Sequence, residues 1–289
     1  RGQRADYDRW RQLGNTGWGY DDILPYFKKA ENQQRGADDF HGTGGPLSVS
    51  DPRQDDPLCD AFIKAATEVG IPANPDFNGA SQEGAGYYQT TTRNGRRGST
   101  ARTYLRSAHI RPNLKIETNA QAQRILFEGK RAVGVVWRQN GALRSARAGR
   151  EVLVSSGAFN SPQLLQLSGV GPGELLRQHG IDVVHDAQGV GASLQDHLQV
   201  RMVMRCTRPI TLNDDVKSLR RSAWMAMRYA MFRTGPLTIA AGYAGAFFKT
   251  DPRLASPDIQ VHFIPFSTDK MGEKLHEFSG FTASVCQLR

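Results

Sequence analysis

Apolar residues recur at helical spacing in three segments of the first quarter of the chain. Residues 6–13 predict a short helix, which the glycines within residues 14–17 end. A second helix is predicted to begin at Asp21 or Asp22, with Pro25 in its first turn, and a third to run from Asp56-Pro57 to Gly70. The expected inward stripes are Ile23, Phe27 and Ala30 in the second helix and Leu58, Phe62, Ala65 and Val69 in the third.

Strand-like patterns fill the middle of the chain. We expect an antiparallel meander of four strands at residues 114–118, 124–127, 132–138 and 143–148, with a hairpin turn at Asn140-Gly141. The apolar run at residues 151–155 follows directly and has the composition of an internal parallel strand. This order predicts an α/β (α+β) fold in which a parallel sheet carries an antiparallel crossover.

The pattern changes again in the last third. After a short helix at residues 173–179 and a strand at 181–184, residues 198–206 alternate as in an antiparallel strand with one wet face. A long helix is predicted from Asp214 or Asp215 to Arg233, followed by a strand at residues 259–263 that carries His262. The expected inward positions of the long helix are Val216, Leu219, Ala223, Met227 and Ala230. His262 fits either a structural role or a place in the lining of a cavity.

Small residues follow the expected strand at residues 151–155. Ser156, Gly157 and Ala158 leave room for another backbone or a ligand to approach closely, and Ser161-Pro162 offers a helix N-cap with proline at the first helical position. A strand that leads into such a turn and a helix start is typical of dinucleotide-binding folds. An ordinary strand-turn-helix unit explains the same pattern equally well.

The residues GAFNSPQLLQLSGVG, from Gly157 to Gly171, resemble the second signature of the glucose-methanol-choline (GMC) oxidoreductases. The resemblance extends to RGQRADYDRW, NGRRGSTARTYL, RPNLKIETNAQAQRI and GVGASLQDH, and so covers nearly the whole chain. It is strongest to the choline-dehydrogenase-like alcohol dehydrogenases. The family implies FAD as cofactor and oxidation of a primary or secondary alcohol by hydride transfer to the flavin.

The resemblance also implies residue roles. Ala122, where the family more often has valine, would reach the adenine through its backbone, and Ser156, Gly157 and Ala158 would line the flavin. The proton-accepting histidine of the family lies beyond the position of Arg289, so we assign no catalytic residue within residues 1–289 and no metal site. We therefore expect residues 1–289 to be an internal fragment that is inactive by itself.

The family's organisation predicts four segments. Residues 1–45 and 93–197 would belong to the FAD-binding domain, and residues 46–92 and 198–289 to the substrate-binding domain. The chain would pass from the FAD-binding domain to the substrate-binding domain near the FHGTGGP loop, where the sequence is rich in Gly, Asp, Gln and Pro.

Composition limits the partners and the compartment. Lys and Arg exceed Asp and Glu by 37 − 28 = 9, but the basic stretch at residues 93–111 lacks the finger ligands or aromatic platform that nucleic-acid binding needs. The three cysteines, Cys59, Cys206 and Cys286, lie far apart without metal-ligand spacing, which favours a reducing compartment and a cytoplasmic protein.

The long helix at residues 214–233 combines Arg220, Arg221 and Arg228 with Trp224 and Phe232. This pattern fits either a packed helix or a peripheral contact with the inner face of a membrane, where a quinone would accept the electrons in place of oxygen. Two other functions remain open on the same scaffold: a hydroxynitrile-lyase-type FAD protein and a non-catalytic flavin-binding remnant.

Overall fold

The computed structural model describes residues 1–240, 242–270 and 272–288. The chain divides into two compact units: unit 1 comprises Arg1–Ile110 with His197–Arg289, and unit 2 comprises residues 111–196. The fold is mixed α/β, because the sheets of the described residues include parallel pairs as well as antiparallel ones. The assignment of the four sequence segments to cofactor and substrate domains stays a prediction.

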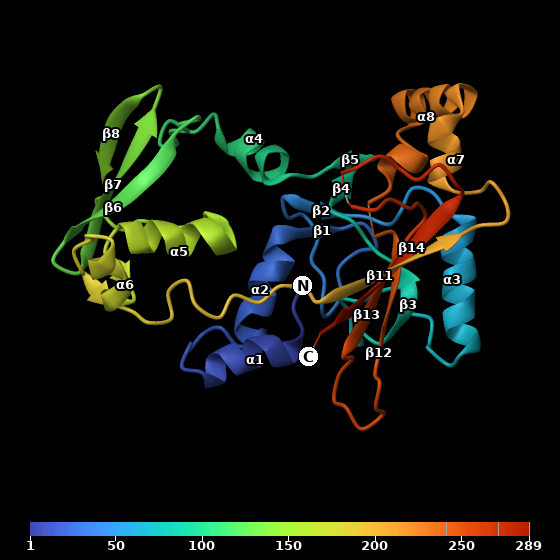
Figure 1. Cartoon of the computed structure of the whole chain (residues 1–289), viewed down its shortest axis with the longest axis horizontal. Helices are drawn as coiled ribbons and strands as arrows, with labels where there is room; N and C mark the ends of the chain where they lie inside the picture. Colours follow the sequence, from blue (N-terminus) through green and yellow to red (C-terminus); the bar gives the residue numbers. More distant parts are fainter. Residues whose placement is uncertain (241, 271, 289) are drawn as a thin grey trace. The chain divides into compact units, whose positions relative to one another are not determined.

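Unit 1 is built on a five-stranded antiparallel sheet of order β11-β14-β13-β12-β3 (Figure 1). Its strands are β3 (Gly84–Tyr87), β11 (Gln199–Arg205), β12 (Ala244–Phe248), β13 (Ile259–Ile264) and β14 (Gly280–Gln287). β14 pairs on both sides, with β11 and with β13, so this late strand lies inside the sheet and its backbone groups are satisfied. β11 is an edge strand, and its apolar residues are exposed, with Val200 at 64%. The prediction that one face of this strand is buried was therefore wrong, because no described element covers that face.

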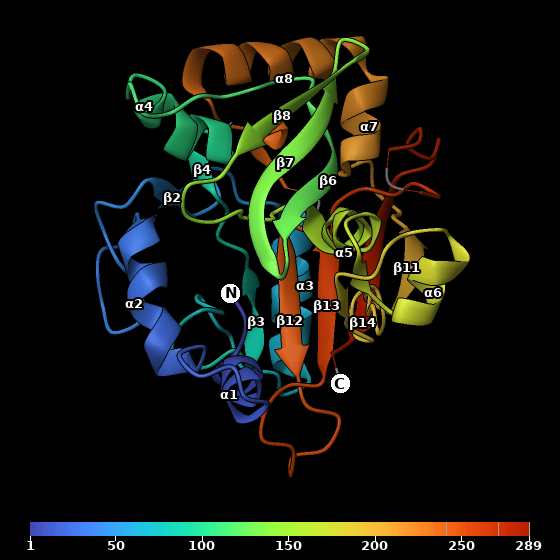
Figure 2. The same ribbon diagram turned by 90° about the vertical axis from the view of Figure 1, so that its left-hand side faces the viewer.

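Helix α3 (Pro57–Glu68) covers one face of this sheet (Figure 2). The Asp56 side chain caps it by accepting hydrogen bonds from the backbone N–H groups of Leu58 and Cys59, at 2.9 and 3.2 Å. Phe62 stacks on Phe263 of β13 with ring centroids 4.8 Å apart. The predicted start and end of α3 are confirmed. The predicted stripe was wrong in part: Cys59 and Ala66 are buried, whereas Ala65 and Val69 are exposed, because the packed face is turned by one residue.

The remaining early elements of unit 1 are short. They are α1 (Arg4–Gln12), α2 (Tyr20–Ala30), β1 (Glu31–Gln33), β2 (Leu47–Val49), β4 (Thr92–Arg93), β5 (Arg96–Arg97), the π-helical turn η1 (Ala101–Leu105) and α4 (Arg106–Ala108). The predicted caps of α2 were wrong. The N-cap is Gly19, whose N–H donates to the Asp22 carboxylate at 3.0 Å, so the helix begins earlier and Pro25 lies inside it.

The predicted long helix is broken at Ser218 into α7 (Leu212–Lys217) and α8 (Leu219–Phe232), and the turn η2 (Pro236–Thr238) follows. The extended backbone of Ser218 ends α7, and its hydroxyl accepts a hydrogen bond from the N–H of Arg221, which caps α8. The predicted inward stripe was wrong. Leu219 is 88% exposed, and Met225 is the buried residue of α8.

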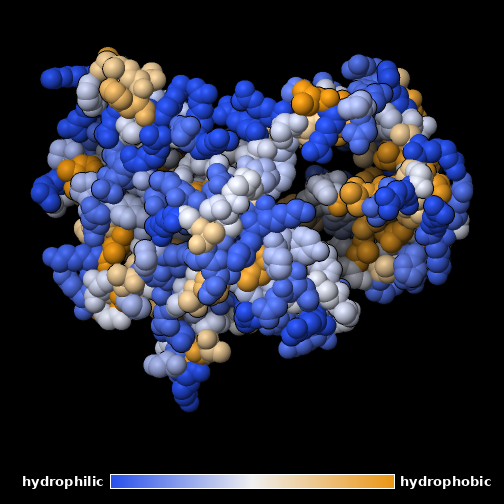
Figure 3. Space-filling model, turned by 180° about the vertical axis from the view of Figure 1, so that it is seen from behind, coloured by the Kyte–Doolittle hydropathy of each residue, from blue (hydrophilic) through white to orange (hydrophobic). Residues whose placement is uncertain are grey.

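A tan and orange patch lies over α8 at the upper left of Figure 3. The exposed large apolar and aromatic residues of α8 are Leu219, Trp224, Met227, Met231 and Phe232. No helix among the described residues is long and apolar enough to cross a membrane. A peripheral membrane contact through α8 stays a prediction.

Unit 2 contains a three-stranded antiparallel sheet of order β6-β7-β8 (Figure 1). It consists of β6 (Gln121–Glu128), β7 (Arg131–Gln139) and β8 (Ala142–Arg147), with α5 (Gly157–Leu167), β9 (Val170–Gly171), α6 (Gly173–Gln178) and β10 (His185–Asp186) following. The predicted hairpin turn is confirmed, since Asn140 and Gly141 both have positive φ, 51° and 81°. The first predicted strand of the meander, residues 114–118, is not a strand.

Two further strand predictions in unit 2 were wrong. Residues 151–155 form no strand, and Leu153 is 80% exposed. A buried parallel strand needs hydrogen-bonded neighbours on both sides, and no described strand pairs with this segment. Residues 181–184 are also not a strand, although the N–H of Val184 donates to the carbonyl of Gly169 at 2.8 Å. The strand begins at the next residue, where His185–Asp186 lies parallel to Val170–Gly171.

Candidate functional site

A pocket of about 820 Å³ lies in unit 1 beside strand β13. Its walls come from the segment after β3, the β4–β5 hairpin, helix α8, and the connection from η2 to β12. The described residues that line it are Tyr88, Gln89, Thr90, Thr91, Thr92, Gly95, Arg97, Tyr229, Leu237, Thr238, Ile239, Ala240, Gly242 and His262. The antiparallel sheet thus supplies one side of a cavity large enough for a small organic substrate.

His262 is the imidazole of this pocket. It lies on β13 opposite Gly245 of β12, and the absence of a side chain at Gly242 keeps the ring accessible, since a Cβ there would lie 3.3 Å from Nδ1. Burial, together with the nearby His197, lowers the pKa of His262 below its ordinary value of 6.5. The imidazole is therefore neutral at neutral pH and can donate one hydrogen bond and accept another. Of the two roles considered for His262, structural or cavity-lining, the structure supports the cavity-lining role.

Tyr88 forms the wall next to His262, with ring centroids 5.8 Å apart. Its hydroxyl accepts a hydrogen bond from Nε2 of Gln260 at 3.1 Å and donates to the carbonyl of Val261 at 3.4 Å. Burial raises the pKa of Tyr88 to about 12. The tyrosine is thus a neutral, fixed hydrogen-bonding group and not an acid near neutral pH.

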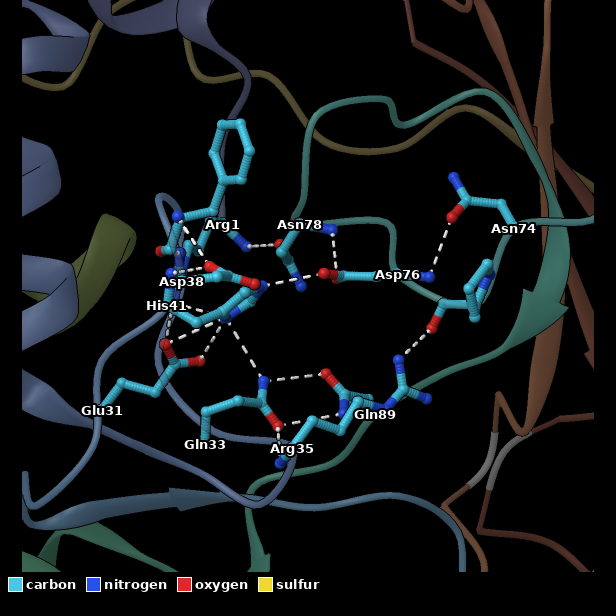
Figure 4. Close-up of polar contacts among 12 residues, drawn as sticks. Arg1, Glu31, Gln33, Arg35, Asp38, His41, Asn74, Asp76, Asn78 and Gln89 are labelled. Carbon is cyan, nitrogen blue, oxygen red and sulfur yellow. Dashed lines mark hydrogen bonds and ion pairs between the residues drawn. The ribbon is translucent and has the colours of Figure 1, made fainter.

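Gln89 connects this pocket to the FHGTGGP loop (Figure 4). The amides of Gln89 and Gln33 exchange two hydrogen bonds, at 3.0 and 3.1 Å, and Gln89 also donates to Asp51 at 2.8 Å. Gln33 in turn lies 3.3 Å from Nδ1 of His41. A continuous polar network therefore fixes the side chain of one pocket residue from a loop far away in the sequence.

His41 is the centre of that network and is 2% exposed. Nδ1 lies 3.0 Å from the Glu31 carboxylate and Nε2 lies 2.8 Å from that of Asp76, so carboxylates hold the ring from both sides (Figure 4). Arg1 forms an ion pair with Glu31, which is itself buried. We call His41, Glu31, Asp76 and Arg1 the His41 network.

Asp38, His41 and Asp76 bring ligand-type atoms within 4.8 Å of one another. Both ring nitrogens of His41 are already hydrogen-bonded, and the Asp38 carboxylate accepts from the backbone N–H groups of Phe40 and His41 at 2.7 and 2.6 Å. These contacts explain the cluster as a structural network that closes the loop.

The turn predicted to line the flavin lies in unit 2. Ser156, Gly157 and Ala158 are exposed at the N-terminus of α5, and Gly157 has φ of +86° with no atom within 4 Å of where a Cβ would be. The predicted cap was wrong, because the helix begins at Gly157 and not at Pro162. The Ser161 hydroxyl nevertheless accepts a hydrogen bond from the N–H of Ser156 at 3.0 Å and so steadies the turn.

Ala122 lies on β6 and pairs with Trp137 of β7, next to a register shift between Ala122 and Arg124. The indole N–H of Trp137 is buried and has no hydrogen-bond partner. An exposed helix N-terminus with an open glycine, and an orphaned indole N–H opposite Ala122, fit a large polar ligand bound to unit 2. The residues present are therefore compatible with FAD.

No residue of the pocket is singled out for it by the sequence, apart from His262. Tyr88, Gln89 and Tyr229 belong to no motif, and Arg97 is one of six arginines within residues 93–111. His41 stands in a loop whose composition predicts only a domain exit. Its partners Glu31 and Asp76 could not be found from the sequence, since nothing in their spacing links them to the loop.

The sequence model of the family described as GMC oxidoreductase matches residues 1–199. The chain belongs to the GMC oxidoreductase family. Members of this family bind FAD. The match covers the whole of unit 2 and the part of unit 1 that carries the His41 network.

Named relatives are choline dehydrogenases. The chain is 42% identical over 289 residues to "Oxygen-dependent choline dehydrogenase" of Brucella suis biovar 1, covering all of this chain and 52% of the relative. It is also 42% identical over 289 residues to "Choline dehydrogenase, mitochondrial" of Mus musculus, covering all of this chain and 48% of that protein. The chain thus spans about half the length of the curated relatives it matches.

Solved structures share the fold. Pyridoxine 4-oxidase from Mesorbium loti superposes with a TM-score of 0.83 at 26% identity, covering 99% of this chain and 53% of that one. A formate oxidase gives a TM-score of 0.87 at 22% identity, over 100% of this chain and 56% of the other. The arrangement of elements is therefore that of about half of a GMC structure.

Proposed function

We propose that residues 1–289 form part of an FAD-dependent oxidoreductase that oxidises a primary or secondary alcohol, with a quinone or oxygen as electron acceptor. The observation that carries the proposal is the pocket on the antiparallel sheet, in which a neutral His262 is the accessible imidazole. Membership in the GMC family and the identity to choline dehydrogenases support this reaction class.

Ser156, Gly157, Ala158 and Ala122 would hold the FAD. The turn offers backbone N–H groups at the start of α5, and the Cβ-free position at Gly157 leaves room beside them. When bound, the flavin supplies the two-electron acceptor that takes a hydride from the carbinol carbon.

The residues of the pocket would bind and orient the alcohol. His262 as a neutral imidazole hydrogen-bonds the substrate hydroxyl, and Tyr88, fixed by Gln260, limits where the hydroxyl can lie. The family resemblance puts the proton-accepting histidine outside residues 1–289, so His262 is proposed as an orienting group and not as the base. Gln89, the lining residue next to Tyr88, is held in place by hydrogen bonds to Gln33 and Asp51.

The test uses the full-length protein loaded with FAD. Anaerobic mixing with a primary alcohol should bleach the absorption of the oxidised flavin, and a dye should then be reduced in steady state. His262→Ala should raise KM or lower kcat/KM by about tenfold to a hundredfold, since one oriented hydrogen bond is lost, while His179→Ala, an exposed histidine of unit 2, should change neither.

Two results would reject the proposal. A flavin that stays oxidised while the protein cleaves cyanohydrins would favour the hydroxynitrile-lyase alternative. A protein that binds FAD and shows neither reaction would favour a non-catalytic flavin-binding remnant.

A further inference from the structure

We infer that the pocket beside His262 selects an uncharged alcohol with an apolar chain and disfavours a quaternary ammonium alcohol such as choline. This inference rests on the proposed function, because it names the substrate class of the same pocket. The inferred preference differs from the choline oxidation that the names of its relatives state.

The charge of the pocket is the first observation. None of its described lining residues is Asp or Glu, and its one permanent charge is the guanidinium of Arg97. Among the described residues, no ion pair neutralises Arg97. A cation that entered would lose its hydration, meet no carboxylate and be repelled by Arg97.

The aromatic rings of the pocket do not replace a carboxylate. Recognition of quaternary ammonium groups without an acid requires open aromatic faces around the cation. The ring of Tyr229 already carries the guanidinium of Arg233 at 4.7 Å from its centroid. Tyr88 is packed against Phe77, Phe247 and His262, with centroids 5.3, 6.3 and 5.8 Å away. Neither tyrosine therefore offers a free cage.

The remaining lining suits a neutral chain. Leu237, Ile239 and Ala240 supply an apolar wall. The hydroxyl groups of Thr90 and Thr92 are hydrogen-bonded to each other at 3.1 Å, and that of Thr92 also to Ser50 at 2.6 Å, so this part of the lining is uncharged and already satisfied. Burial of each additional methylene against such a wall improves binding by about fourfold. A linear or branched aliphatic alcohol gains from this wall, and a trimethylammonium group does not.

The test compares choline with its carbon isostere, in which a tert-butyl group replaces the trimethylammonium group. The two alcohols have the same shape and differ in charge, so kcat/KM of the full-length FAD-loaded enzyme isolates the electrostatic effect. We expect the isostere to be preferred by about tenfold or more, and kcat/KM to rise from ethanol to hexanol. Equal use of the two alcohols, or a preference for choline, would overturn the inference.

Arg97→Glu should reverse part of the preference. It replaces the repelling charge by an attracting one, and the choline-to-isostere ratio should rise by about tenfold. Arg96→Glu is the matched control, since Arg96 and Arg97 are both exposed on β5 but only Arg97 lines the pocket. The logarithm of the choline-to-isostere ratio should change less than half as much in Arg96→Glu as in Arg97→Glu. If Arg97→Glu fails to fold, Arg97→Gln provides the same test with a smaller rise.

Failure of the proposed function is distinguishable. If neither alcohol is oxidised, the proposed reaction is wrong, and perturbation of the flavin spectrum by each alcohol still measures binding. Tighter binding of the isostere then supports the inference. Tighter binding of choline, or binding of neither, overturns it.

Discussion

Replacing His41 by alanine should destabilise the protein by about 3 kcal/mol, because it removes the group that joins two carboxylates. Each hydrogen bond between a histidine and a carboxylate contributes about 1.5–3 kcal/mol. Loss of the contact to Glu31 should cost its full hydrogen-bond energy, since both groups are buried. Loss of the contact to Asp76 should cost less, because its side chain is 25% exposed and can be hydrated in the variant. Glu31 keeps its ion pair with Arg1 and the N–H of Gly42, which limits the loss.

The measurement is urea denaturation of the full-length protein, with the midpoint and slope fitted separately. His179→Ala is the control and should shift the free energy of unfolding by less than about 0.5 kcal/mol. A double-mutant cycle with Asp76→Asn should show a coupling of about 1–2 kcal/mol, because the two side chains are in direct contact. A loss below about 1 kcal/mol for His41→Ala, or no coupling, would show that the network does not hold the loop.

Three further substitutions probe other parts of the chain. Gly157→Ala should lower the free energy of unfolding by about 1 kcal/mol and reduce the flavin content, because Gly157 has a φ of +86°. Gly149→Ala is the control, since Gly149 has equally open space around it and no positive φ, and it should change neither quantity. Thermal melting and flavin absorbance measure the two effects. His262→Gln should flatten the pH dependence of stability below pH 6.5. The pKa of His262 is lower in the folded protein than in the unfolded chain, so protonation favours the unfolded chain and the wild-type protein loses stability as the pH falls. Melting temperatures of both proteins measured across this range would contradict the prediction if the two curves remain parallel. Asp56→Ala should cost about 1 kcal/mol through loss of the α3 cap, against less than about 0.5 for exposed Asp55→Ala; equal losses in denaturation would refute the capping role.

Elements whose boundaries depend on neighbouring residues could be predicted from the amino-acid order alone. Asp56-Pro57 and Gly70 fixed both ends of α3 because a cap, a constrained φ and a left-handed residue act within one turn. Asn140-Gly141 fixed the β7–β8 hairpin for the same reason. The GMC signature is also a local pattern, and its residues alone were enough to indicate the family.

Which face of a helix or strand is buried depends on the elements that pack against it, and could not be predicted from the sequence. The apolar stripe of α8 has helical period, but periodicity does not say which side packs, and Met225 lies inward while Leu219 lies outward. Residues 151–155 have the composition of a buried strand, but a strand exists only where a neighbour supplies hydrogen bonds, and no described strand does.

The candidate site depended on the tertiary structure most of all. Tyr88, Tyr229 and His262 meet in one pocket although more than a hundred residues separate the first from the second. Glu31, His41 and Asp76 are joined by hydrogen bonds that no spacing along the chain encodes. Tyr88 and His262 come together because the five-stranded sheet of unit 1 pairs β3 and β13 with β12, and such strand pairing joins segments that are distant in the sequence.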